Sequence, residues 1–196
     1  MEPIRDPLEA AARIQKVLHE AGVESMVIGG LAVAIWGEPR TTRDADIKVS
    51  LQRKDAETLI HSLPADRYQL APDSASLLRQ FGFLFIKDKD GPRIDLLLAE
   101  TSFDDEAIAR RRDVRILGDL TLRVCTPEDL IIYKMISTRA RDQADLSGIL
   151  ARQRHRLDHA YVERWLAEFE QALDDSTLVR SYRRMLELVR DDDTSP

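Results

Sequence analysis

Two glycines and two closely spaced aspartates are the first residues of this sequence whose types and spacing could do chemistry. The stretch GGLAVAIWGEPRTTRDAD begins with Gly29 and Gly30 and ends with Asp44 and Asp46. If residues 43–50 form a strand, Asp44 and Asp46 project from the same face, with Cα atoms roughly 6.5 to 7 Å apart. Carboxylates this close repel each other unless a positive charge lies between them. The spacing therefore indicates a site for one or two hard cations.

Magnesium, or manganese in its place, is the cation that suits this site, because it prefers oxygen ligands and completes its shell with phosphates and water. Two such ions about 3.5 to 4 Å apart can activate a nucleophile and stabilise a leaving pyrophosphate. Gly29 and Gly30 come between an apolar strand and a helix, where backbone N–H groups can approach phosphates. The sequence contains neither a GK[ST] ending nor a GxGxxG pattern. A nucleotide-binding interpretation therefore depends on the glycines together with the acidic pair.

Asp95 is a candidate third carboxylate, because it interrupts the apolar segment RIDLLLA. Charged side chains are rarely buried without a partner. One interpretation is a strand-end aspartate that faces water. The other is a third metal ligand on a strand next to the one that carries Asp44 and Asp46.

Apolar periodicity and turn residues indicate the elements that would position these side chains. In the first part we expect helices at 7–21, 31–37, 54–62 and 102–112 and strands at 23–28 and 43–50. We expect an irregular stretch after residue 62. Two further strands within 81–99 would be joined by a turn at 88–91, and a second hairpin would lie around 117–119. Thr126 and Pro127 form a helix start, and only helices follow to about residue 189, with breaks near Gly148, Leu157 and Asp174. The fold class is therefore α+β for residues 1–125 and all-helical for residues 126–196. Because no Gly- or Ser-rich linker separates the two parts, we expect the helices to pack on the sheet.

Composition narrows the class of protein. The chain has 196 residues, 43% hydrophobic residues and a single cysteine, Cys125, which fits a reducing cytoplasm. The sequence has no apolar run long enough for a membrane and no signal-peptide pattern at its start. The formal net charge of −6 argues against a general nucleic-acid binder. Clustered arginines at 110–112 and 139–156 are interpreted as solvated helix faces, although they could contact RNA or a nucleotide.

Taken together, Gly29-Gly30, Arg40, Thr42, Asp44, Asp46 and the later Asp95 resemble the nucleotidyltransferase superfamily that includes DNA polymerase β. The pattern is most similar to the minimal AbiEii-like branch, which contains toxins of type IV toxin–antitoxin systems. The resemblance implies a small mixed β-sheet flanked by helices and followed by a helical carboxy-terminal region. It implies Asp44, Asp46 and Asp95 as metal ligands, and Gly29, Gly30, Arg40 and Thr42 as nucleotide-binding residues. Many members have Gly-Ser where this chain has Gly29-Gly30, so a phosphate-binding hydroxyl is missing here.

A second segment, which begins at Glu128, resembles the same branch. The resemblance implies Lys134 as a phosphate or transition-state ligand and Asp142 as a supporting or basic carboxylate. Arg139 and Arg141 could add phosphate contacts, and Asp145 lies one helical turn after Asp142. The structural alternatives are a Lys134 side chain that extends to water and an Asp–Arg network that ties helices together.

The implied function is magnesium-dependent transfer of a nucleoside monophosphate from a nucleoside triphosphate to an acceptor hydroxyl. By resemblance the acceptor could be a tRNA 3′ end, which would make the protein a toxin with a cognate antitoxin partner. A protein side chain or a small molecule such as an aminoglycoside is the other possible acceptor. The alternative from a different class is a non-catalytic binding protein that keeps the fold, such as the antitoxin-type partner of a toxin.

Overall fold

The computed structural model describes residues 7–89, 91–116, 118–137 and 139–192. Contacts divide the chain into two compact units, residues 1–31 with 41–125, and residues 32–40 with 126–196. The later boundary lies between Cys125 and Thr126, where the sequence changes from mixed to helical character. The grouping of residues 32–40 with the carboxy-terminal helices was not expected. Within the described ranges no helix is both long and apolar enough to cross a membrane.

The first unit is built on a mixed sheet of seven strands among the described residues, in the order β3-β4-β5-β2-β1-β7-β6. Two neighbouring pairs, β2 with β5 and β1 with β7, are parallel, and the other pairs are antiparallel. The strands are β1 (Glu24–Val27), β2 (Asp44–Ser50), β3 (Tyr68–Gln69), β4 (Phe83–Asp88), β5 (Arg93–Leu98), β6 (Arg112–Arg115) and β7 (Thr121–Val124). The expected hairpins at 88–91 and 117–119 are present as the antiparallel pairs β4–β5 and β6–β7, while Asp90 and Leu117 themselves lie outside the described residues.

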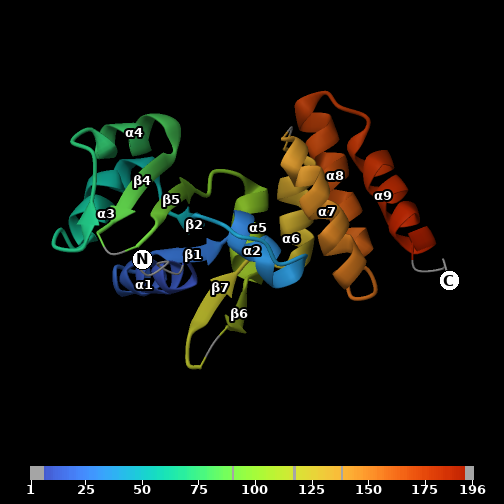
Figure 1. Ribbon diagram of the computed structural model, residues 1–196. Coiled ribbons are helices and arrows are strands. Elements are labelled where there is room, and N and C mark those ends of the chain that lie inside the picture. Colours follow the sequence, from blue (N-terminus) through green and yellow to red (C-terminus); the bar gives the residue numbers. More distant parts are fainter. Residues whose placement is uncertain (1–6, 90, 117, 138, 193–196) are drawn as a thin grey trace. The chain divides into compact units, whose positions relative to one another are not determined.

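Helices of the first unit cover this sheet (Figure 1). They are α1 (Pro7–Glu20), a 3-10 turn η1 (Arg53–Asp55), α3 (Ala56–Ser62), α4 (Ser74–Phe81) and α5 (Ser102–Arg110). Helix α1 packs against β1, β2 and β7, and α3 and α4 lie beside β4, far from β6 and β7. Thr101 and Asp104 form a reciprocal capping box that begins α5.

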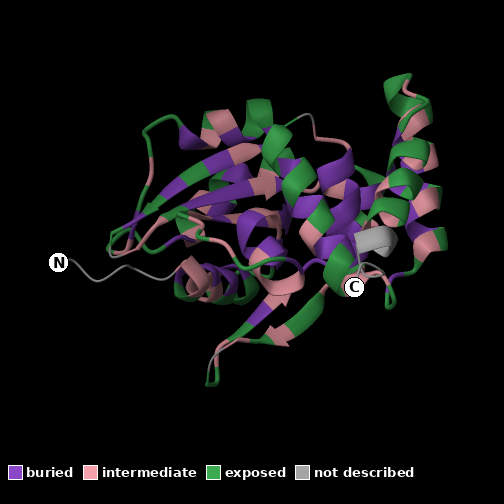
Figure 2. Ribbon diagram, turned by 45° about the vertical axis from the view of Figure 1, so that its right-hand side comes forward, coloured by how far each residue is buried: buried purple, intermediate pink, exposed green. Residues whose placement is uncertain are grey.

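Strand β2 shows why the sheet presents acidic groups on one side. Its residues alternate in burial, and Ala45, Ile47 and Val49 are fully buried on one face. The intervening residues, Asp44 and Asp46 among them, therefore point to the other face. Figure 2 shows this alternation as purple bands separated by pink or green ones along the strands. Burial of the apolar face holds the register, because a slip by one residue would move every apolar side chain to the polar face.

The stretch after residue 62 was expected to be irregular, and this expectation was wrong. It contains β3 and α4. Strand β3 is only two residues long and is defined by pairing with β4, where Tyr68 lies opposite Asp88. Asp88 is buried and forms ion pairs with Arg13 at 3.1 Å and Arg67 at 3.3 Å. These partners are distant in sequence, so local patterns did not reveal the element.

The second unit consists of helices. Helix α2 (Gly29–Trp36) begins in the first unit and continues into the second, which also contains α6 (Pro127–Met135), α7 (Ala140–Gln153), α8 (His159–Leu173) and α9 (Leu178–Asp192). The expected helix start is confirmed, because the Thr126 hydroxyl accepts the backbone N–H of Asp129. The expected break at Gly148 was wrong, since Gly148 lies inside α7. A Cβ there would come within 3.0 Å of Glu38 Cγ, so glycine permits a close approach rather than a turn.

Candidate active site

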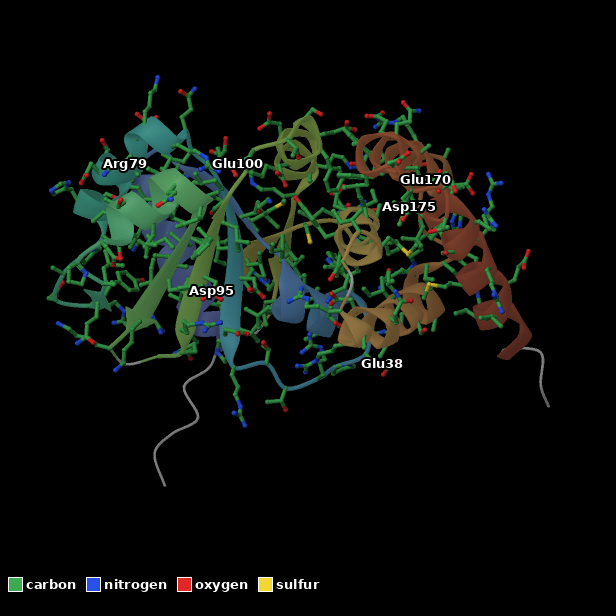
Figure 3. The ribbon with its side chains drawn as sticks, turned by 90° about the horizontal axis from the view of Figure 1, so that it is seen from above. Glu38, Arg79, Asp95, Glu100, Glu170 and Asp175 are labelled. Carbon is green, nitrogen blue, oxygen red and sulfur yellow. The ribbon has the colours of Figure 1, made fainter. Side chains whose placement is uncertain are left out.

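The three predicted carboxylates lie on one face of the sheet, near the amino ends of β2 and β5. The parallel register pairs Asp46 with Asp95 and Asp44 with Arg93. Paired residues of neighbouring strands project to the same side, so all four side chains share this face. Figure 3 shows Asp95 near one end of β5 and Glu100 beyond its other end. The tertiary structure therefore brings Asp44, Asp46 and Asp95 onto one surface.

Asp95 is buried, with 9% of its surface exposed, so the interpretation as a water-facing aspartate was wrong. Its Oδ2 accepts a hydrogen bond from Arg93 Nη2 at 2.8 Å. Its Oδ1 lies 2.8 Å from Arg93 Nε but has no hydrogen-bond partner of acceptable geometry among the described residues. Burial raises the pKa of Asp95, and Arg93 offsets part of that rise. An unsatisfied buried oxygen on a ligand-type side chain is a feature of sites that bind a further group.

Asp44 is more exposed and is held by two neighbours. The Thr42 hydroxyl donates to Asp44 Oδ1 at 3.1 Å, and Arg93 Nη2 lies 3.4 Å from Asp44 Oδ2. Thr42, predicted to bind nucleotide, is placed to orient Asp44. Arg93 bridges Asp44 and Asp95 and was missed in the sequence. Its position two residues before Asp95 on the same strand face was the signal that could have identified it.

Gly29 lies against the carboxylate of Asp46. It has a left-handed backbone conformation with φ of 62°, and a Cβ there would overlap Asp46 Oδ2 and lie 2.7 Å from Asp46 Cγ. The backbone N–H of Ile28 also donates to the Asp46 carbonyl at 3.0 Å. Gly30 is buried at the start of α2. The glycine turn after β1 and the second aspartate of the acidic pair are therefore neighbours.

These residues fit a hard divalent cation in chemistry. The donor set is three carboxylates, and one buried oxygen of Asp95 is unsatisfied. In the present arrangement, however, no group of three His, Cys, Asp or Glu side chains within the described residues could hold a metal ion. Arg93 supplies positive charge to Asp44 and Asp95 instead. A cation at this face would compete with Arg93 for the carboxylates.

The second predicted set forms a buried ion-pair network in the helical unit. Lys134 is 5% exposed, so the interpretation of a side chain that extends to water was wrong. Its Nζ donates to Asp142 and, at 2.6 Å, to Asp145 Oδ2. Arg40 donates to both carboxylate oxygens of Asp145 at 2.9 and 3.2 Å, and Arg139 Nε lies 3.1 Å from Asp142. Both carboxylates are thus shared between a buried lysine and an arginine.

The charges in this network determine the protonation of Asp142. Burial acts to raise its pKa, but hydrogen bonds from Lys134 and Ser137 and the charges of Lys134 and Arg139 together lower it below the ordinary value. Arg40, predicted to bind nucleotide, is engaged with Asp145, whereas Arg141 is exposed. That Lys134 and Asp142 act together with Asp44, Asp46 and Asp95 stays a prediction.

Comparison with known proteins identifies the family to which the chain belongs. A family model described as "Nucleotidyl transferase of unknown function (DUF2204)" matches residues 7–184. Comparison with curated proteins gives no significant match. The fold is similar to the crystal structure of an antigenic nucleotidyltransferase-like protein from Paracoccidioides brasiliensis, at 16% identity over 88% of this chain and 91% of that chain, with a TM-score of 0.52.

The fold is also similar to two solved structures of an antibiotic-resistance factor. The solution structure of ANT(2'')-Ia shares 13% identity over 85% of this chain and 92% of that chain, with a TM-score of 0.55. The crystal structure of ANT(2'')-Ia with adenylyl-2''-tobramycin shares 13% identity over 85% of this chain and 98% of that chain, with a TM-score of 0.54. At this identity the likeness concerns the fold alone. The family match covers most of the chain, and on that ground the protein belongs to the nucleotidyl transferase family DUF2204 and is a nucleotidyltransferase.

Proposed function

We propose that the protein transfers a nucleoside monophosphate from a nucleoside triphosphate to an acceptor hydroxyl, with release of pyrophosphate, in the presence of magnesium or manganese. The observation that supports this proposal best is the common face of Asp44, Asp46 and Asp95 on two paired parallel strands. Divalent cations held by such carboxylates neutralise the charge that develops on the phosphates. The AbiEii-like branch, a toxin role with an antitoxin partner and a cytoplasmic location stay predictions from the sequence.

The glycine turn is the proposed triphosphate site. Gly29 has the backbone conformation and the absence of a side chain that let a phosphate approach the start of α2, where backbone N–H groups are unpaired within the helix. Because Gly29 lies against Asp46, the triphosphate and the carboxylates would be adjacent. Gly30 contributes backbone only, so no hydroxyl assists at that position.

Asp95 is the proposed proton acceptor. In the transfer, the acceptor oxygen forms a bond to the α-phosphorus, the bond from that phosphorus to the β-phosphate oxygen breaks, and pyrophosphate leaves with the bond electrons. The hydroxyl proton passes to Asp95, whose pKa is raised by burial and whose Oδ1 has no hydrogen-bond partner in the described chain. Asp44, oriented by Thr42, and Asp46 would hold the cations, and Asp95 would bind one of them in addition to its role as proton acceptor.

Roles for the helical unit are proposed from the resemblance. Lys134 and Arg141 would neutralise the triphosphate, Asp142 would support Lys134, and Arg40 would contribute to nucleotide binding. The observed network favours a positioning role for Asp145, since it binds both Lys134 and Arg40. A Lys134→Arg variant keeps the charge but changes the geometry. A rise in the Kd for the triphosphate without loss of helical stability would support phosphate binding by Lys134.

The test is a labelled-nucleotide transfer assay. The full-length protein is incubated with Mg²⁺, each α-labelled nucleoside triphosphate and three acceptor pools, namely total RNA, an unrelated polypeptide and an aminoglycoside panel. The aminoglycoside pool is included because ANT(2'')-Ia has a similar fold. Asp46→Asn should abolish labelling, while the exposed turn variant Asp66→Asn should retain it. Labelling that persists in Asp46→Asn, or no labelling in any pool together with no Mg²⁺-dependent triphosphate binding, would contradict the proposal.

A further inference from the structure

Three phenylalanines form an aromatic row next to the acidic face. Phe81 ends α4, and Phe83 and Phe85 are alternate residues of β4, so the two strand residues share one face. Their ring centroids are 5.9 Å apart for Phe81 and Phe83 and 5.0 Å apart for Phe83 and Phe85. Phe81 is 52% exposed and Phe85 is 50% exposed, the only large aromatic side chains in the described chain with such exposure. Exposed apolar groups gathered in this way mark an interaction surface.

The sheet register places this row directly beside the carboxylates. Phe85 lies opposite Asp95 on β5, and Asp95 lies opposite Asp46 on β2. The three residues therefore form one line across three neighbouring strands on the same face, with about 4.8 Å between strands. Gly29 lies against Asp46 at the opposite end of this line. If the triphosphate occupies the glycine end, the Phe85 end of the line is left for the acceptor.

Two cations border the aromatic row. Arg93 Cζ lies over one face of the Phe85 ring, 5.2 Å from its centroid, and exposed Lys87 is the register partner of Arg93 on β4. A combination of exposed aromatic rings and adjacent basic side chains suits an unpaired nucleobase that stacks and a phosphate that pairs with the cations. Arg93 is already paired with Asp44 and Asp95, so Lys87 is the cation that a phosphate would reach first. An aminoglycoside has no aromatic ring that could stack on these side chains. The exposed rings therefore favour a single-stranded nucleic acid over an aminoglycoside, despite the net charge of −6 for the whole chain.

We propose that Phe81, Phe83 and Phe85, with Arg93 and Lys87, bind the unpaired 3′-terminal nucleotides of a single-stranded nucleic acid and present its terminal hydroxyl to Asp95. This inference depends on the proposed function, because it assigns the acceptor side of the same site. The terminal base stacks on the Phe85 ring. The adjoining phosphate contacts Lys87 and Arg93 by charge-assisted hydrogen bonds.

The experiment measures binding separately from transfer. A fluorescein-labelled single-stranded RNA 10-mer with a free 3′ hydroxyl is titrated with the full-length protein at fixed low salt, and anisotropy gives the Kd. A blunt duplex of the same sequence and a 3′-phosphorylated strand are the ligand controls. Stacking is worth roughly 1–3 kcal/mol per base, so Phe85→Ala should weaken binding of the single strand about 5- to 150-fold.

Matched variants distinguish stacking from general apolar contact. Phe85→Trp should retain binding, and Phe85→Leu should lose it, since leucine is apolar without a ring face. Leu173, 56% exposed in α8, provides the control Leu173→Ala, which should leave the Kd unchanged. Lys87→Gln should weaken binding and reduce its dependence on salt by about one ion equivalent.

Failure of this inference is distinguishable from failure of the proposed function. If Phe85→Ala and Phe85→Leu bind the strand as well as wild type does, or if only a small-molecule or polypeptide pool is labelled, the aromatic row is not a nucleic-acid platform, even though transfer exists. If Asp46→Asn loses transfer but still binds the strand in a Phe85-dependent manner, the platform and the catalytic assignment are both supported. Phe85-dependent strand binding by a protein that shows neither transfer nor Mg²⁺-dependent triphosphate binding supports the platform and overturns the proposed function alone.

Discussion

The backbone of Gly29 and the carboxylate of Asp46 occupy adjoining space, with no room for a side chain between them. A Cβ on Gly29 would lie 2.7 Å from Asp46 Cγ, and the φ of 62° at Gly29 is itself unfavourable for other residues. The contact joins the turn after β1 to the acidic strand β2. It joins the proposed phosphate site directly to a proposed metal ligand.

Gly29→Ala should therefore damage the site more than the fold. Strain at a positive φ should lower the free energy of unfolding by about 1–2 kcal/mol. Displacement of the Asp46 carboxylate should lower the rate of nucleotide transfer roughly 100-fold. Gly22→Ala is the matched control, because Gly22 has a φ of 73° but no atom within 4 Å of a Cβ. Urea denaturation and transfer rates are measured for both variants. Equal loss of transfer in the two variants would mean that the contact with Asp46 has no role.

Gly30→Ser should strengthen nucleotide binding. Many members of the superfamily that the sequence resembles have serine at this position. A hydroxyl at the start of α2 would donate one hydrogen bond to a phosphate, which is worth about 1 kcal/mol and lowers the Kd for the nucleotide roughly fivefold. Titration of the protein with a fluorescent triphosphate analogue in Mg²⁺ provides the measurement. Unchanged or weaker binding would place the triphosphate away from Gly30.

Arg93→Gln should increase the affinity for a divalent cation. Arg93 now supplies the positive charge near Asp44 and Asp95, and its half-exposed ion pairs are each worth about 0.2–1 kcal/mol. Removal of this competitor should lower the Kd for Mn²⁺ about 2- to 5-fold in calorimetric titration. Arg79→Gln, which breaks an exposed pair with Glu57, is the control and should have no effect. A higher Kd in Arg93→Gln would show that Arg93 does not compete for the carboxylates.

Asp95→Asn should stabilise the fold at neutral pH. The folded-state pKa of Asp95 is raised by burial above its unfolded value, so ionisation opposes folding. That penalty is absent below the unfolded pKa of about 3.9, and it is complete once the pH exceeds the folded pKa. The variant should therefore exceed wild type in free energy of unfolding at pH 7 and match it near pH 3.5, while transfer is lost. A variant less stable than wild type at pH 7 would contradict the assignment.

Asp142→Asn should show the opposite dependence on pH. Its folded-state pKa is lowered, so the ionised carboxylate stabilises the fold above the unfolded pKa, and this contribution is lost as the pH falls through the folded pKa. Loss of the charge leaves buried Lys134 with Asp145 alone and should cost about 3 kcal/mol at pH 7. Glu168→Gln breaks only the exposed pair with Arg164 and should cost less than about 0.5 kcal/mol. A deficit in Asp142→Asn that is the same at pH 7 and pH 3 would exclude the charge as its cause.

The common face of Asp44 and Asp46 followed from sequence alone, because side chains alternate along any strand whatever it pairs with. The cap at Thr126 and the hairpin between β4 and β5 were equally readable, since their signals lie within a few residues. The resemblance also identified Asp95 as the third carboxylate. All these features depend on local geometry or on short patterns.

Only the tertiary structure determined what surrounds those residues. The β2–β5 register places Asp46 opposite Asp95, and the β4–β5 register adds Phe85 to the same line. Arg93 beside the carboxylates, and Lys134 buried with Asp142, are consequences of pairing and packing between separated segments. Sequence periodicity specifies which way a side chain points within its own element. Its partner depends on which elements pair and in which register, and that choice is set by burial of the whole apolar face.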